Sequence, residues 1–148
     1  MLRDTVKKYI EYELKHDAHR ELYHYNCAQA ILHGSNDYYN LHLDSKALKL
    51  IVPFGGGMYV GYTCGMLTGG IAVIGVMFAE DMPTTHLKLK EITRSWIEQF
   101  ESEFQNTNCS IIKDINLKDG EGCANLILKA ADILQGVIEK YSDIKAID

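Results

Sequence analysis

The chain has 148 residues, of which 47% are hydrophobic, and carries a net charge of −5 from acidic and basic residues that are mixed along the sequence. The length and the hydrophobic content predict a compact globular chain with a core of its own and argue against disorder. No Lys/Arg cluster occurs, which argues against a nucleic-acid-binding protein and against binding to an anionic membrane surface.

The N-terminal stretch is polar and contains no apolar signal region. The longest apolar run, Leu67 to Ala79, is interrupted by glycines and is shorter than the roughly 20 residues needed to span a bilayer. We therefore expect a cytoplasmic protein without membrane insertion. In a reducing cytosol, permanent structural disulfides are uncommon.

The first third of the chain has apolar residues at helical spacing, separated by polar loops. Tyr38 and Tyr39 are expected in a loop that covers the core, following Ser35. The helices predicted here cover residues 2 to about 18, residues 27–32 after an Asn26 cap with an end near Gly34, and a third helix that begins at an Asp44 or Ser45 cap and stops before Pro53.

The segment from residue 53 to residue 70 is rich in glycine and contains three consecutive glycines after Pro53-Phe54. Such a segment allows positive φ angles or a close approach of the backbone to another group. Thr63 is a good N-cap residue, which would place Cys64 at the first position of a buried helix that runs to about Glu80. There the free N–H groups and the helix dipole would stabilise a thiolate and lower the pKa of Cys64.

The last 65 residues, from residue 84 onward, predict three more helices. Thr84 or Thr85 would cap a long helix to about Phe104, whose apolar stripe is Leu89, Ile92, Trp96, Phe100 and Phe104. Such a stripe normally packs in the core, and its aromatic content is also compatible with part of a homodimer interface. A short helix from Cys109 to Ile115, a loop at residues 119–122 and a last helix that Cys123 opens complete the chain.

Because strand-period alternation is absent, we predict a single all-α domain over residues 1–148. Its architecture would be a compact bundle of five or six helices with a glycine-rich loop before a buried central helix.

The four cysteines share one local pattern, because each follows a residue type preferred at helix N-caps: Asn26-Cys27, Thr63-Cys64, Asn108-Cys109 and Gly122-Cys123. All four sulfurs would thus lie in first turns of helices, where thiolates are stabilised. No C-x-x-C motif is present, so neither a thioredoxin-type motif nor a zinc ribbon is indicated. His16 and His19 are spaced to share a helix face, but an exposed surface pair is favoured over a metal pair because no zincin pattern completes them.

The motifs from residue 26 to about residue 134 resemble one known family. They are Asn-Cys-Ala-Gln-Ala at 26–30, Phe-Gly-Gly-Gly at 54–57, Thr-Cys-Gly-Met-Leu-Thr-Gly at 63–69, Cys109 and Gly122-Cys123. This order of cysteines around a glycine-rich core is similar to the C-GCAxxG-C-C family of small redox-active proteins. The resemblance implies redox activity without naming a substrate, and a transport-linked partner. The chain departs from the family where Met66 replaces the usual alanine, which enlarges a small site beside Cys64.

Three functions follow from these residues. In the first, a thiolate attacks an oxidised partner protein or small thiol and a second cysteine resolves the mixed disulfide; Cys64 is the expected attacking residue because glycines flank it. The resolving residue is any of Cys27, Cys109 and Cys123, and three full pairings are open. No cofactor is expected in that case. The second is a zinc or iron–sulfur site held by all four thiolates. The third is a helical interaction module with cysteines as core residues.

Overall fold

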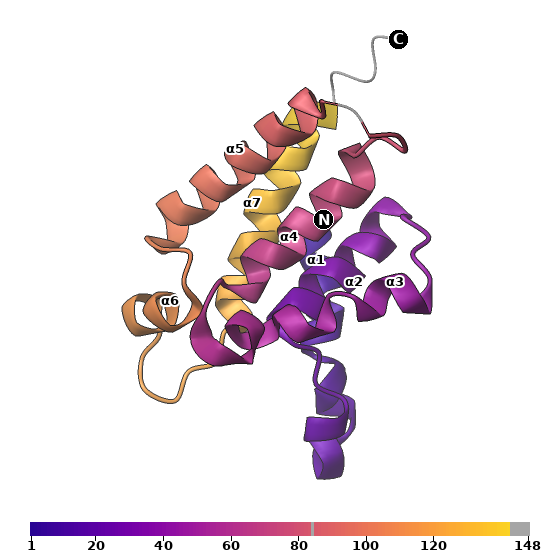
Figure 1. The fold of residues 1–148 in the computed structure, drawn as a ribbon. Coiled ribbons are helices and arrows are strands. Elements are labelled where there is room, and N and C mark those ends of the chain that lie inside the picture. The colour runs from indigo at the N-terminus through magenta and orange to yellow at the C-terminus, as the bar shows by residue number, and fades with distance from the viewer. Residues whose placement is uncertain (84, 143–148) are drawn as a thin grey trace.

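All regular elements are helical in the computed structural model, which describes residues 1–83 and 85–142 (Figure 1). Its α-helices are α1 (Leu2–Ile10), α2 (Cys27–Tyr39), α3 (Ser45–Lys49), α4 (Gly65–Phe78), α5 (Leu87–Phe104), α6 (Cys109–Asn116) and α7 (Ala124–Ser142). Four short helical turns accompany them: η1 (Tyr12–Lys15), η2 (Asp17–Leu22), η3 (Val52–Phe54) and η4 (Gly57–Gly61). The all-α prediction is confirmed, although the described residues divide into more helices than the five or six expected.

Helix α4 lies at the centre of the fold and packs against α2, α5 and α7. Its sequence is apolar around the whole circumference, which is typical of a helix covered on all sides. Met66, Leu67, Val73 and Ile74 are accordingly buried. The prediction of a buried helix after a glycine-rich segment is confirmed, with an end at Phe78 instead of Glu80.

Helix α5 contributes the aromatic part of the core. Trp96 and Phe100 are fully buried and Phe104 nearly so, and the indole Nε1 of Trp96 donates a hydrogen bond to the carbonyl of Leu67 at 3.0 Å. This stripe therefore packs inside the chain itself. The helix begins at Leu87 with His86 as its N-cap residue, one residue later than a Thr85 cap would place it, and Thr84 lies outside the described residues.

The two largest differences from the predicted boundaries lie in the first 40 residues. Helix α1 ends at Ile10, because no residue of η1 or η2 is buried and a longer helix would have no apolar face to pack. Helix α2 has the predicted Asn26 cap but continues through Gly34 to Tyr39, so the loop expected at residues 35–39 is helical. Gly34 is needed inside the helix because a β-carbon there would lie 2.5 Å from Cγ2 of Val6.

The remaining predicted boundaries are nearly correct. Asp44 caps α3 by accepting the Ala47 N–H at 2.8 Å, but α3 ends at Lys49. Pro53 does not stop this helix; it lies in the first turn of η3, where its missing N–H costs nothing. Helix α6 begins at Cys109 as expected, and α7 begins at Ala124, one residue after the predicted Cys123.

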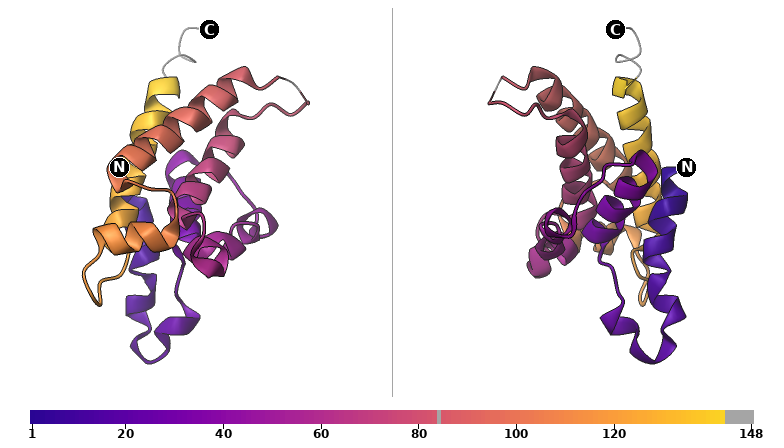
Figure 2. Two further views of the ribbon diagram at one scale, coloured as in Figure 1. Left: turned by 60° about the vertical axis from the view of Figure 1, so that its left-hand side comes forward. Right: turned by 90° about the vertical axis from the view of Figure 1, so that its right-hand side faces the viewer.

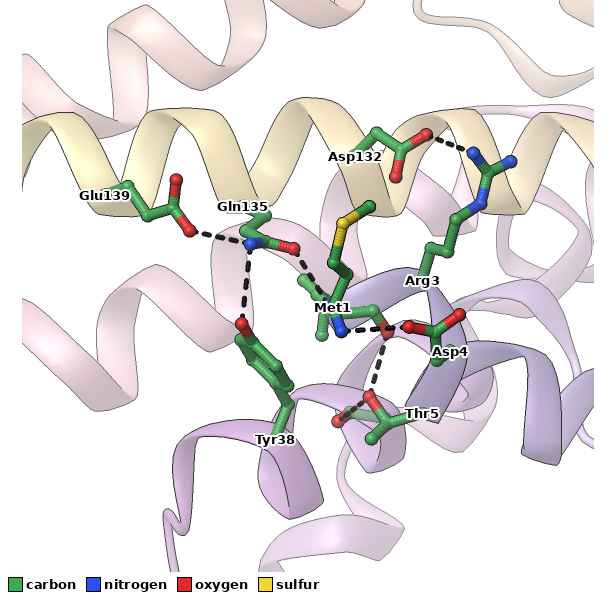
Figure 3. Close-up of polar contacts among 10 residues, drawn as sticks. Met1, Arg3, Asp4, Thr5, Tyr38, Asp132, Gln135 and Glu139 are labelled. Carbon is green, nitrogen blue, oxygen red and sulfur yellow. Dashed lines mark hydrogen bonds and ion pairs between the residues drawn. The ribbon is translucent and has the colours of Figure 1, made fainter.

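The N-terminal residues are attached to α7 and α2 (Figure 3). The Leu2 N–H donates to Oε1 of Gln135 at 2.8 Å, and Arg3 pairs with Asp132 at 2.8 Å. Thr5 Oγ1 donates to the Gly34 carbonyl at 2.9 Å. These contacts fix α1 between the two helices whose N-terminal ends carry Cys27 and Cys123.

The turns η1 and η2 form an arm that extends from one end of the bundle (Figure 1, Figure 2). The starts of α2, α4 and α7 and the whole of α6 lie at this same end, so several helix N-termini gather there. None of the helices in the described part of the chain combines the length and apolarity that crossing a bilayer requires.

Candidate functional site

All four cysteines line one cavity of about 350 Å³ at the end of the bundle next to the arm. They come from four separate elements: the start of α2, the residue before α4, the start of α6 and the residue before α7. The fold thus brings together every cysteine that the sequence indicated as a site residue. No disulfide joins them; all four are free thiols.

The start of each of these helices faces the cavity. Cys27 and Cys109 occupy the first positions of α2 and α6, after Asn26 and Asn108, whose side chains cap the helices by accepting backbone N–H groups at 2.9 and 3.1 Å. Cys64 is itself the N-cap residue of α4, so the prediction that Thr63 caps this helix is wrong by one residue. Four helix N-termini therefore direct the positive ends of their dipoles toward the sulfurs.

A short antiparallel bridge between Thr63 and Asn108 fixes Cys64 and Cys109 relative to each other. The Cys64 N–H donates to the Thr107 carbonyl at 2.9 Å, and the Cys109 N–H donates to the Tyr62 carbonyl at 2.6 Å. Because side chains alternate along an extended backbone, two residues that each follow the bridged pair lie on the same side. This accounts for the presence of both cysteines at one cavity.

Cys27 reaches Cys64 through a close contact between α2 and α4. A β-carbon at Gly65 would lie 2.5 Å from the sulfur of Cys27 and 2.9 Å from the Phe54 carbonyl oxygen. Only glycine fits at position 65, and the sulfur of Cys27 lies against the residue that follows Cys64. The two thiols consequently belong to one packed group at the cavity wall.

The turn η4 forms part of the same end of the molecule and has a left-handed backbone. Gly56, Gly57, Met58 and Tyr59 all have φ between +58° and +63°. The sequence predicted positive φ for the glycines, but Met58 and Tyr59 adopt it as well, at a typical cost of about 1–2 kcal/mol each. A β-carbon at Gly57 would lie 2.8 Å from Cβ of Cys109, so this unusual turn packs directly against a site residue.

Burial dominates the acidity of Cys64. Its side chain is only 4% exposed, and this burial, followed by repulsion from Cys27, raises the pKa of Cys64 to about 12. The backbone N–H groups of Met66 and Leu67 lower the pKa only partly in return. The prediction that helix-start placement lowers the pKa of Cys64 is therefore wrong, because desolvation of the thiolate outweighs the helix terminus.

Cys109 and Cys123 share a nearby cation. Burial raises the pKa of both thiols, and the positive charge of Lys113 lowers each pKa in part. Lys113 lines the cavity together with them. Met66, which was expected from the sequence to enlarge the site, also lines the cavity and is only 1% exposed, so its side chain forms part of the wall beside Cys64.

The arm contributes two polar side chains that sequence reasoning missed, Glu13 and His24. Nδ1 of His24 lies 2.6 Å from Oε2 of Glu13. No spacing rule joins residues 13 and 24, so nothing in the sequence indicated this pair. The ring of His16, which was considered with His19 for a metal pair, stacks on Tyr23 with centroids 3.5 Å apart. In the described residues, no group of three or more His, Cys, Asp or Glu is arranged to hold a metal ion.

Comparison with known families gives a match over most of the chain. The family model described as Putative redox-active protein (C_GCAxxG_C_C) matches residues 25–137, a range that includes all four cysteines and η4. Comparison with curated proteins and with solved structures gave no match. Since the matched range covers well over half of the sequence, the chain belongs to the C_GCAxxG_C_C family.

Proposed function

We propose that this protein carries out thiol–disulfide redox chemistry with Cys27, Cys64, Cys109 and Cys123 as its reactive set. The observation that carries the proposal is the shared cavity: four cysteines from four separate elements of the fold line it. The family description supports redox activity in general. Because thiols at helix N-termini ionise more easily than other thiols of equal burial, the four convergent helix starts favour the same chemistry.

Cys27 is the best attacking residue of the four. Its side chain is partly exposed and sits at the first position of the 13-residue helix α2, whereas Cys64 and Cys109 are buried. Cys123 is also partly exposed, but it precedes α7 and does not occupy a helical position. A disulfide substrate entering the cavity can therefore reach the sulfur of Cys27. Attack forms a bond from Cys27 Sγ to one substrate sulfur and releases the other as a thiolate, which takes up a proton.

Cys64 is the best resolving residue because Cys27 already packs beside it. Repulsion from a Cys27 thiolate is one cause of the raised pKa of Cys64. Burial is the larger cause and stays, but Cys27 carries no charge in the mixed disulfide, so its repulsion no longer opposes ionisation of Cys64. Its thiolate then attacks Cys27 Sγ, a Cys27–Cys64 disulfide forms, and the second substrate sulfur leaves as a thiol. Two protein thiols are oxidised and one substrate disulfide is reduced.

Cys109 and Cys123 form the second pair in this scheme, with Lys113 stabilising whichever of them ionises. Exchange between the two pairs would pass oxidising equivalents from one side of the cavity to the other. The reaction needs no bound cofactor, since electrons enter from a reduced small thiol or a partner protein with a dithiol. Such a partner belongs to a reducing compartment like the cytosol, and a transport-linked protein is one candidate.

Differential alkylation tests the proposal. Protein purified without oxygen is treated with a mild disulfide oxidant, its free thiols are blocked, and each cysteine peptide is quantified by mass spectrometry. We expect thiols to disappear two at a time, Cys27 with Cys64 first, and to return on reduction while the helical circular dichroism is unchanged. A C27S variant should not form the Cys27–Cys64 disulfide, and a C123S variant should still form it.

The same preparation distinguishes the metal alternative. Stoichiometric zinc or iron in the protein, with loss of helical structure when a chelator removes it, would contradict the disulfide scheme and support a four-thiolate site. Four thiols that react only after denaturation, with no metal present, would instead support the interaction module.

A further inference from the structure

We propose that His24, oriented by Glu13, accepts the proton of the Cys27 thiol at the mouth of the cysteine cavity. This inference rests on the proposed redox function and deepens it by adding a proton acceptor to the four sulfurs. Both side chains line the cavity together with all four cysteines. His24 lies three residues before Cys27 in the sequence, and both residues line this cavity.

The Glu13–His24 contact gives the imidazole the geometry of a proton acceptor. When Nδ1–H of His24 donates to Oε2 of Glu13 at 2.6 Å, Nε2 becomes the ring nitrogen with a free lone pair. The side chain of His24 is 60% exposed and that of Glu13 is 26% exposed, so the pair sits at the cavity rim and not in the core.

Aromatic packing fixes the arm on which the pair lies. Tyr12 precedes Glu13, and Tyr23 and Tyr25 flank His24 on both sides. The ring of Tyr12 contacts both of these rings, with centroid distances of 6.1 Å to Tyr23 and 5.5 Å to Tyr25. Tyr25 in turn packs edge-on against Tyr9 of α1. The two residues are thus positioned by rings that tie the arm to the bundle.

The proton transfer completes the balance of the attack. The proton leaves Cys27 Sγ for Nε2 of His24, and the resulting thiolate bonds to one sulfur of the substrate disulfide. The other sulfur departs with the electron pair of the broken S–S bond and takes the proton back from the imidazolium. His24 therefore ends each attack in its starting state, and Glu13 acts as a positioning residue.

Several other charged or titratable groups surround the pair. Within the cavity these are Tyr25, Lys113 and the remaining cysteines. On the arm, Arg20 interacts with Glu13 and pairs with Asp17 at 2.7 Å. The range matched by the family begins at residue 25, so Glu13 and His24 both precede it.

The test is the alkylation rate of Cys27 from pH 5.5 to pH 9.5, followed by mass spectrometry with a small neutral alkylating reagent. An unassisted thiol is only a few per cent thiolate at pH 7, so we expect H24Q to slow Cys27 alkylation about tenfold at that pH. At pH 9.5 the two rates should converge. E13Q should give a smaller loss of about threefold. H19Q, a matched change of an exposed arm histidine that does not line the cavity, should leave the rate unchanged.

A pH profile of H24Q that coincides with that of the parent protein would overturn the proposal. So would an equal loss in H19Q, which would indicate a disturbed arm, or a loss in H24Q that persists at pH 9.5. Disulfide mapping separates this inference from the proposed function. If Cys27 and Cys64 oxidise reversibly in every variant and the rates do not respond to H24Q, only the role of His24 fails.

Discussion

Helix α5 and the segment from Gly55 to Gly61 differ in backbone conformation and in the burial of their apolar side chains. In α5 the apolar stripe is buried from Ile92 onward, most charged residues are exposed, and the helix runs from Leu87 to Phe104. In the glycine-rich segment the backbone is left-handed over consecutive residues, and the side chains of Tyr59 and Val60 are 69% and 62% exposed. Helix α5 thus combines a regular backbone with buried apolar side chains, whereas the glycine-rich segment combines a strained backbone with exposed apolar surface.

The difference teaches where this fold tolerates unfavourable structure. Strained backbone persists only where the surroundings determine it, and it concentrates at functional sites. Here the strained turn packs on Cys109, and the regular helix α5 contributes no residue to the cavity. The stable core of α4, α5 and α7 therefore supports an end of the bundle that is organised for chemistry.

The strongest test of the stable region is W96A. Removing a fully buried indole and its hydrogen bond to Leu67 leaves a large cavity, and the free energy of unfolding should fall by about 3–5 kcal/mol. Urea denaturation followed by circular dichroism measures the loss. E98A, an exposed change on the same helix, should alter stability by less than about 0.5 kcal/mol. Equal losses in both variants would contradict the assignment of the stripe to the core.

The second test is the stability of the fold in alkali. Because the pKa of Cys64 is raised to about 12 in the folded state, its thiol stays protonated there while the unfolded chain ionises above about pH 9. The contribution of the protonated Cys64 thiol to the free energy of unfolding is complete below pH 9. It is lost as the pH rises toward 12, at up to about 1.4 kcal/mol per pH unit. C64A should show a shallower decline between pH 9 and pH 11 in urea denaturation. An identical decline would mean that Cys64 is not desolvated.

The third test compares two glycines of helix α4, one beside the cysteine cavity and one away from it. G65A introduces a β-carbon that meets the sulfur of Cys27 and the Phe54 carbonyl, and we expect a loss of about 1–3 kcal/mol together with slower Cys27–Cys64 disulfide formation. G75A lies in the same helix with no atom within 4 Å of the new carbon, and it should stabilise the protein by up to about 1 kcal/mol. If the two variants oxidise at equal rates, the contact at Gly65 does not control the pair.

The smallest effect is expected in the strained turn itself. M58G removes the side-chain penalty at φ +61° and should raise the free energy of unfolding by about 1 kcal/mol. V60G changes a residue of the same turn that lacks positive φ, so it should lower stability by about 0.5–1 kcal/mol. Thermal unfolding of the M58G and V60G variants shows whether each substitution raises or lowers stability. A loss of stability in both variants would show that Met58 is not strained.

The sequence predicted the parts that depend on local rules. The apolar stripe of α5 and the caps at Asn26, Asp44 and Asn108 are local patterns, and the structure confirms them. The extension of α2 through Gly34 was missed because it depends on contact with Val6, which is distant in sequence.

In the cysteine site, too, features that depend on local sequence were predicted and features that depend on tertiary packing were not. Proximity of the cysteines was suggested by their shared position at helix starts. The high pKa of Cys64 was not, because burial is decided by tertiary packing and outweighs the local helix effect. Glu13 and His24 could not be found either, since the irregular arm that joins them has no periodic pattern.

The hydrogen bond from Leu2 to Gln135 closes a loop of nearly the entire described chain (Figure 3). During synthesis α1 can pack on α2 at once, but its contacts with α7 form only when the last helix has been made, and Cys27 and Cys64 leave the ribosome long before Cys123. Until the last helix arrives, the early thiols have no completed cavity and are open to oxidation or wrong pairing. A reducing environment during synthesis therefore protects these thiols until the cavity is complete.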